Sequence, residues 1–208
     1  MRLLKVSFIA GILGLAAHAG IIYDNITGVT SFDRSSVGVN NLYDSFTAPS
    51  NSSLTGLEMI LDAFTPADGG SITIALYADS STSAGSLIAT LATVNDSALP
   101  STPTIEAITL GSNPSLTAGT RYWIGISTSN ASSIEWSYEG KTGGGIGVSG
   151  EYWERGTSVA ANSPAPSREA YQMQLTTDAG SSAPEPSSAL LITGGAGLIW
   201  WFGRRRVG

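Results

Sequence analysis

The chain contains no cysteine and a single histidine, His18, among its 208 residues. Without cysteine there is no disulfide framework and no thiol nucleophile. His18 falls inside a predicted N-terminal signal, so the rest of the chain also lacks the imidazole that a Ser-His-Asp triad or a His/Cys zinc site requires. These absences remove the commonest nucleophilic and zinc-dependent reactions from the functions open to the exported region.

Charged side chains are scarce, at 12% of the sequence, and basic ones are the scarcer kind. Residues 20–183 include 15 acidic and five basic side chains, which gives this region a net charge of −10. Such a charge disfavours nucleic acid and other anionic polymers as partners. Calcium remains an alternative, because residues 62–70 and 77–80 offer loop oxygens, although no stretch matches an EF-hand loop. Turn formation is the simpler explanation of these aspartates, and we expect no cofactor.

The acidic residues leave one kind of catalysis open. Two carboxylates that flank a glycosidic bond can hydrolyse it. Nothing in the spacing of the 15 acids singles out such a pair, and acids scattered over the surface are ordinary in exported β-proteins. We therefore expect no enzyme activity and keep a glycan hydrolase with paired carboxylates as the remote alternative.

The N-terminus has the pattern of a secretory signal peptide. Arg2 and Lys5 precede an apolar run at residues 6–17, and Ala17 and Ala19 then form a small-x-small cleavage site. Basic, apolar and small residues in this order predict cleavage by signal peptidase after Ala19. An uncleaved anchor is the alternative, but the apolar run is short for a membrane span.

The C-terminus carries a second apolar segment. Residues 187–202 contain no charge and are followed by three arginines. As a helix these residues would be about 24 Å long, short of the ~30 Å hydrocarbon core. Arginine snorkelling and interfacial tryptophans would cover the difference, and the arginines would stay cytoplasmic. A plain membrane anchor is one interpretation of this segment.

The order of features in this tail resembles the PEP-CTERM sorting signal of Gram-negative bacteria. Its marks are a Pro-Glu-Pro motif, the apolar segment and a basic end, formed by Pro184, Glu185, Pro186, residues 187–202, Arg204, Arg205 and Arg206. The aromatic cluster at residues 200–202 is bulkier than the usual run. The resemblance implies recognition and cleavage by an exosortase, passage from the inner membrane to the cell surface or outside, and association with exopolysaccharide.

The region between the two ends has the pattern of β-strands. Apolar residues alternate with polar ones at residues 71–78, 120–127, 133–139 and 170–177, which is typical of half-buried strands. Residues 54–64 and 86–94 are also predicted strands, with a helical reading left open. Turn-forming clusters separate these runs and predict an all-β, antiparallel β-sandwich.

The predicted organisation has five parts. They are a signal peptide (1–19), a β-sandwich domain (20–176), a linker with the Pro-Glu-Pro motif (177–186), a transmembrane helix (187–203) and a basic cytoplasmic tail (204–208). Three stretches of the middle region, at residues 23–25, 72–91 and 116–127, resemble the choice-of-anchor β-sandwich domains of bacterial surface proteins. That resemblance implies a jelly-roll-like fold and no catalytic residues.

The aromatic residues raise the question of a ligand. Flat rings can stack on the faces of sugars, and the candidate platform comprises Trp123, Trp136, Tyr152 and Trp153. Core packing is the simpler role for each ring. The leading hypothesis is a non-catalytic surface or matrix protein, and a carbohydrate-binding module is its main alternative.

Overall fold

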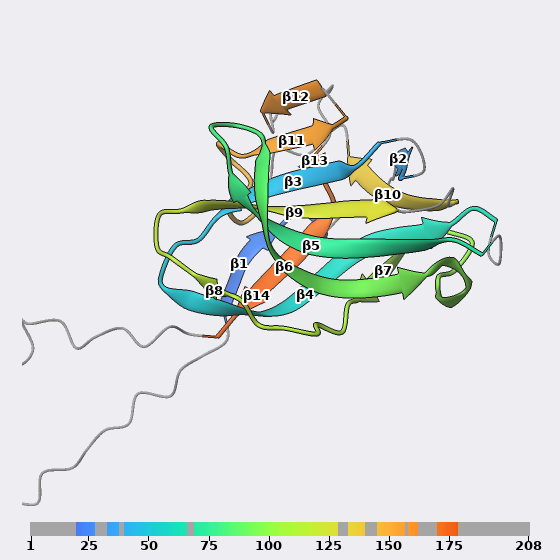
Figure 1. Ribbon diagram of the computed structural model, residues 1–208, viewed down its shortest axis with the longest axis horizontal. Coiled ribbons are helices and arrows are strands. Elements are labelled where there is room, and N and C mark those ends of the chain that lie inside the picture. Colours follow the sequence, from blue (N-terminus) through green and yellow to red (C-terminus); the bar gives the residue numbers. More distant parts are fainter. Residues whose placement is uncertain are drawn as a thin grey trace, which may run out of the picture.

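The computed structural model describes residues 20–27, 33–37, 40–65, 69–128, 133–139, 145–156, 158–161 and 170–178. The described residues form an all-β fold of two antiparallel sheets (Figure 1). The predicted signal peptide with Ala17 and Ala19, the Pro-Glu-Pro motif, the apolar segment and the three arginines lie outside the described residues. Within the described residues, no helix is long and apolar enough to cross a membrane.

Sheet A is the larger sheet, with eight strands in the described part of the chain. Its central path runs β1-β14-β4-β10-β13, with β2 beside β10 and with β7 and β8 beside β4. The strands are β1 (Gly20–Asp24), β2 (Asp33–Ser36), β4 (Ser52–Ala63), β7 (Thr104–Ala107), β8 (Ser115–Leu116), β10 (Ile134–Glu139), β13 (Ala170–Tyr171) and β14 (Met173–Thr177).

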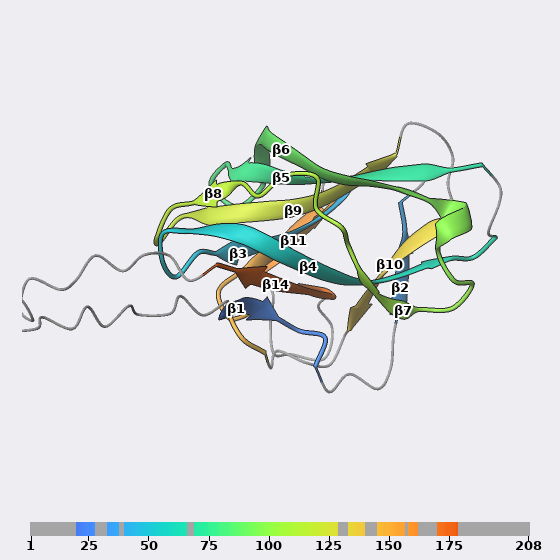
Figure 2. The ribbon, with the colours of Figure 1, turned by 90° about the horizontal axis from the view of Figure 1, so that it is seen from below.

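Sheet B has six strands in the described residues, in the order β12-β11-β3-β9-β5-β6. Figure 2 shows β6, β5 and β9 in one layer and β4, β14 and β1 in the other. A 3-10 helix, η1 (Asp96–Ala98), follows β6. The strands are β3 (Leu42–Thr47), β5 (Ser71–Asp79), β6 (Ala84–Asn95), β9 (Arg121–Thr128), β11 (Tyr152–Arg155) and β12 (Ser158–Ala161).

The strand pairs are nested and alternate between the sheets. The β5–β6 hairpin is innermost and lies in sheet B, and β4 pairs with β7 in sheet A. Outside these, β3 pairs with β9 in sheet B and β1 with β14 in sheet A. This is the arrangement of a long hairpin rolled over on itself, with β2, β10–β13 and β11–β12 added at the margins.

The core lies between the two sheets and is built from the predicted alternation. Ile72, Ile74 and Leu76 of β5 in sheet B belong to the same buried apolar cluster as Leu57 and Met59 of β4 in sheet A. Burial of alternate apolar side chains is the main driving force for such sheets to stack. Five of the six predicted strands are confirmed as single strands, including the two for which a helix remained open, and the sixth is divided in two.

Three features differ from the predicted elements. The run at residues 170–177 is broken at Gln172, where β4, β10 and β13–β14 meet. Gln172 donates its N–H to the Ser137 carbonyl at 2.9 Å, while its own carbonyl accepts from Ile60 N–H at 3.2 Å. The predicted linker begins too early, because Thr177 ends β14 and Asp178 N–H donates to the Ser53 carbonyl at 3.1 Å. One of the turn-forming clusters between the predicted strands, at residues 111–120, contains the short strand β8.

Candidate ligand-binding face

The face of sheet B that points away from the core carries most of its polar and aromatic groups. Side chains directly opposite each other in paired strands share a face, so the register defines this surface, named here the outer face of sheet B. It is formed by Tyr43, Ser45 and Thr47 of β3, Tyr77 and Asp79 of β5, Arg121, Trp123 and Gly125 of β9, and Tyr152 and Glu154 of β11.

Two tyrosine rings meet over Gly125. A Cβ atom added to this glycine would lie 2.5 Å from Tyr43 Cε1 and 2.7 Å from Tyr77 Cε2, so only glycine leaves room for both rings. The rings contact each other edge to face, with centroids 5.3 Å apart. Burial, together with the neighbouring Tyr43, raises the pKa of Tyr77 above its usual value, and a hydrogen bond with Ser127 lowers it by less. Both phenols are half-buried.

The β5–β6 connection, residues 80–83, reaches across the outer face of sheet B together with Ala84, the first residue of β6. The backbone N–H of Ala84 donates to Glu154 Oε2 at 2.8 Å, although Glu154 belongs to β11 at the other side of the sheet. At the start of the connection, Asp79 Oδ1 accepts from Trp123 Nε1 at 2.8 Å. Figure 1 shows this hairpin rising past β9 and β3 towards β11.

A second polar cluster centres on Glu151, which precedes β11 and is buried. Its carboxylate accepts from Ser45 Oγ and Thr47 Oγ1, both at 2.5 Å, and from Arg121 Nε at 2.9 Å. The Arg121 guanidinium also lies 4.8 Å from the centroid of the Tyr152 ring. A buried carboxylate with three donors is fixed in place, and it holds Arg121 over the tyrosine.

The predicted platform of four rings is not assembled as a surface. Trp123 points to the outer face of sheet B, opposite to Ile124, but it is 0% exposed. Trp136 is also 0% exposed and stacks on Tyr171 in the core, with centroids 4.7 Å apart. Neither ring can meet a sugar, so this part of the prediction is wrong.

Trp153 and Tyr152 are half-buried neighbours that point to opposite faces of sheet B. Trp153 packs against the core and contacts Tyr171 edge to face. Tyr152 alone of the four predicted rings lies on the outer face with partial exposure. Tyr43 was not predicted because its strand, β3, has no clear alternation. Tyr77 lies on a predicted strand, but it comes close to Tyr43 only because β3 and β5 both flank β9.

The other buried carboxylates are bonded into the fold. Asp24 accepts from Ile26 N–H and Thr27 N–H at 2.9 and 3.1 Å. Burial alone would raise the pKa of Asp24, but hydrogen bonds from Thr27, Ile26 and Gln174 lower it below its usual value. Asp96 holds the loop before β5 through Gly69 N–H at 3.0 Å. These bonds give each acid a structural role.

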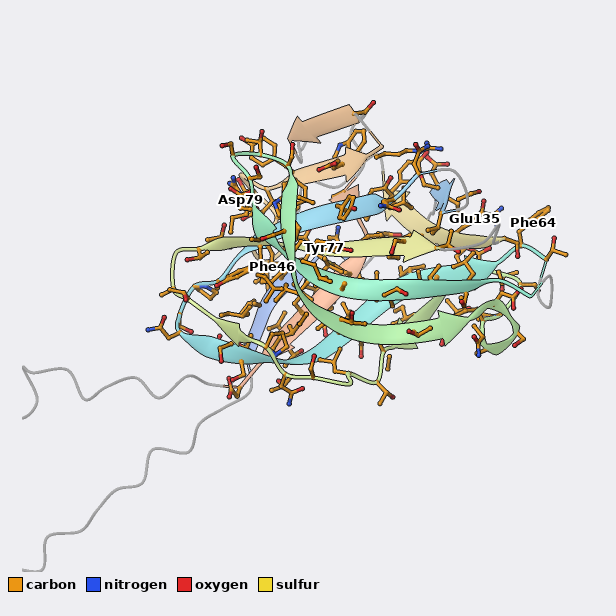
Figure 3. All side chains as sticks on the ribbon, viewed as in Figure 1. Phe46, Phe64, Tyr77, Asp79 and Glu135 are labelled. Atoms are coloured by element: carbon orange, nitrogen blue, oxygen red, sulfur yellow. The ribbon has the colours of Figure 1, made fainter. Side chains whose placement is uncertain are left out.

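One pair of carboxylates shares a cation. Arg34 Nη1 lies 2.9 Å from Asp62 Oδ2 and 3.2 Å from Glu135 Oε2. The guanidinium thus occupies the space between the two acids where a glycosidic oxygen would have to enter. Figure 3 places Glu135 at the end of the molecule opposite to Asp79.

The residues considered for calcium are used differently. Asp62 binds Arg34, and Asp79 accepts from Trp123. Asp68 lies outside the described residues. Among the residues that the structure describes, no cluster of three or more His, Cys, Asp or Glu side chains is suited to hold a metal ion.

Comparison with protein-family models gives no match to this chain, and a search of curated proteins gives none either.

Proposed function

We propose that the chain is a non-catalytic protein of the cell surface or extracellular matrix, exported by its N-terminal signal and sorted by its PEP-CTERM-like tail. In this proposal signal peptidase and an exosortase are its processing partners, the inner membrane is its transient location, and exopolysaccharide is its neighbour outside. The nested strand pairs also support the proposal that the domain is jelly-roll-like.

The pairing of the two ends of the fold carries this proposal. Gly20 of β1 lies opposite Thr177 of β14, so the chain enters the first strand and leaves the last one at the same end of this strand pair. Gly20 directly follows the predicted cleavage site, and the described fold ends at Asp178, ahead of Pro184. Both addressing segments can therefore be removed without loss of any strand in the described residues.

Replacement of Pro184, Glu185 and Pro186 by alanine should trap a full-length form in the inner membrane. Proline disfavours helix and sheet pairing at its own position and at the residue before it, and a processing protease needs such an extended peptide. Membrane fractionation combined with mass spectrometry of both termini measures the result.

The matched control replaces Gly180, Ser181 and Ser182, just ahead of the motif, by alanine and should be processed normally. An alanine variant of the motif with unchanged mature mass and location would reduce the tail to a plain anchor. Cleavage anywhere other than after Ala19 would separately refute the signal peptide assigned here.

A carbohydrate-binding module is the second candidate, and the outer face of sheet B favours it. Three half-buried tyrosines, Tyr43, Tyr77 and Tyr152, lie there with a fixed arginine and a carboxylate, which is the mixture of flat rings and polar groups that sugars need. This set replaces the predicted platform.

Retention of the full chain on neutral polysaccharides tests this candidate. Tyr152→Ala should then reduce retention about tenfold. Phe64→Ala is the control, because Phe64 is 69% exposed and lies far from Tyr77 (Figure 3). Absence of retention on every neutral polysaccharide would eliminate this candidate and leave the surface-protein proposal intact.

A further inference from the structure

The two sheets are open along the edge formed by β6 and β7. Figure 2 shows the chain leave β6 in one layer and pass through η1 to β7 in the other. A groove with a volume of about 300 Å³ lies between them. It is lined by Ala92, Thr93, Val94, Asn95, Ala98, Leu99, Glu106, Ala107, Ile108 and Thr109. A volume of this size is at the lower end for small-molecule sites.

Glu106 is the charged residue of this groove. It lies opposite Met59 in the β4–β7 pair, and Met59 belongs to the core, so the Glu106 side chain points inward between the sheets. The side chain is half-buried. In the described part of the chain the salt bridges involve Asp62, Glu135 and Glu151, and no hydrogen bond to the Glu106 side chain is found. A half-buried carboxylate without a counter-ion favours a cationic ligand.

The remaining lining defines what kind of cation fits. Thr93, Asn95 and Thr109 line the exposed mouth of the groove. The β5–β6 register puts the Thr93 and Asn95 side chains on the face of β6 opposite to Val94, so they border the groove and do not surround Glu106. Val94, Leu99 and Ile108 supply an apolar floor. A polar mouth around an apolar floor matches a pyranose ring, whose C–H face is apolar and whose rim carries hydroxyls.

We propose that this groove binds an amine-bearing sugar residue, with the ammonium group paired to Glu106 and the ring packed on the apolar floor. The strongly acidic character of residues 20–183 would attract such a cation from solution. This site is separate from the outer face of sheet B and does not depend on how the protein is exported.

Calorimetric titration of the full chain in detergent, at about pH 6 where the sugar amine is protonated, tests the proposal. The probes are a β-1,4-linked glucosamine tetramer, its N-acetylated counterpart and a blocked Gly-Lys-Gly peptide. We expect the glucosamine tetramer to bind with a dissociation constant on the order of 1 mM or below. The acetylated tetramer, which lacks the charge, should bind about tenfold more weakly.

Three variants locate the site. Glu106→Gln should weaken binding of the glucosamine tetramer about tenfold, and Ala98→Leu should also weaken it by filling the groove from an exposed position. Glu58→Gln is the matched control, because Glu58 lies on the neighbouring strand and points to the other face of sheet A.

Equal affinity of the wild type and Glu106→Gln would overturn the proposal, as would equal affinity for the acetylated tetramer. A peptide that binds as tightly as the sugar would show that the groove selects a lysine side chain, which also overturns it. If none of the probes gave a binding signal, the proposal would also be overturned. Glu106 would then be an inward-pointing charge that protects a sheet edge from pairing.

Discussion

Replacement of Asp44 by alanine should lower the free energy of unfolding by about 3–5 kcal/mol. Asp44 belongs to β3 in sheet B but points into the core, between Leu42 and Phe46, and is fully buried. Its carboxylate accepts from the Tyr23 hydroxyl at 3.3 Å and from Tyr171 N–H at 2.5 Å, and both donors belong to sheet A. One acid therefore connects the two layers.

The loss should be large because the alanine variant removes a charged acceptor from two buried donors and leaves a cavity beside them. Chemical denaturation of the full chain in detergent, followed by tryptophan fluorescence, measures it. Tyr23→Phe is the matched control: it removes one donor and should cost about 1 kcal/mol. An alanine variant within about 1 kcal/mol of the wild type would show that Asp44 does not hold the sheets together.

The structural roles of the residues in the Tyr23–Asn25 stretch could not be predicted from the sequence. Its resemblance to surface-protein domains gave no role for its residues, whereas the structure gives three. Tyr23 donates a hydrogen bond to Asp44, and Asp24 closes the turn at residues 26–27. The side-chain amide of Asn25 pairs with backbone groups, as the backbone of a neighbouring strand would. The Asn25 amide donates to the Tyr171 carbonyl at 3.0 Å and accepts from Met173 N–H at 2.8 Å.

Alternation along a strand predicted the core well. Successive side chains of a strand point to opposite faces, so the local sequence is enough to tell which residues share a face. The alternation at residues 71–78 puts Ile72, Ile74 and Leu76 on one face, and these three side chains are buried in the core. The alternation at residues 120–127 puts Trp123 opposite to Ile124, and Trp123 lies on the outer face of sheet B. It could not predict that Trp123 is covered. The connection that reaches across its face is fixed by a bond between Ala84 and Glu154, 70 residues apart in the chain.

The Glu151 cluster was unpredictable for the same reason. Its serine and threonine donors lie on β3, more than 100 residues earlier. The short strands β1, β2 and β3 also escaped prediction, since β2 is polar and β3 places Asp44 where an apolar residue is expected. Long-range register, which no local pattern encodes, assembles both the polar clusters and the groove at Glu106.

Replacement of Arg34 by alanine should destabilise the fold by about 2–3 kcal/mol at pH 7. Asp62 has 0% side-chain exposure, and its Oδ2 atom lies 2.9 Å from Arg34 Nη1. Its other oxygen has no hydrogen-bond partner in the described part of the chain. Without Arg34 the buried charge would keep only the like charge of Glu135 beside it. The expected loss of stability is moderate because Arg34 is 36% exposed, so that solvent screens its interaction with Asp62.

The pH dependence of this variant follows from Asp62. Burial raises the pKa of Asp62 above the usual value for aspartate, while the hydrogen bond and charge of Arg34 act in the opposite direction. Loss of Arg34 would raise the pKa further, so the folded state would bind a proton more readily than the unfolded state. The destabilisation of the variant relative to the wild type should therefore be largest above the folded-state pKa of Asp62. It should diminish as the pH falls through that pKa towards the pKa of aspartate in the unfolded state.

A double variant separates this effect from lost packing. Asp62→Asn removes the buried charge, so Arg34→Ala combined with Asp62→Asn should be more stable at pH 7 than Arg34→Ala alone, and its difference from the wild type should change less with pH. Arg155→Ala, at an exposed arginine of β11, is the control for loss of a surface cation. Denaturation curves of all four variants at pH 5 and pH 7, against the wild type, measure the coupling between the two side chains. If the double variant were as unstable as Arg34→Ala at both pH values, the packing of the arginine, and not the burial of Asp62, would account for the loss.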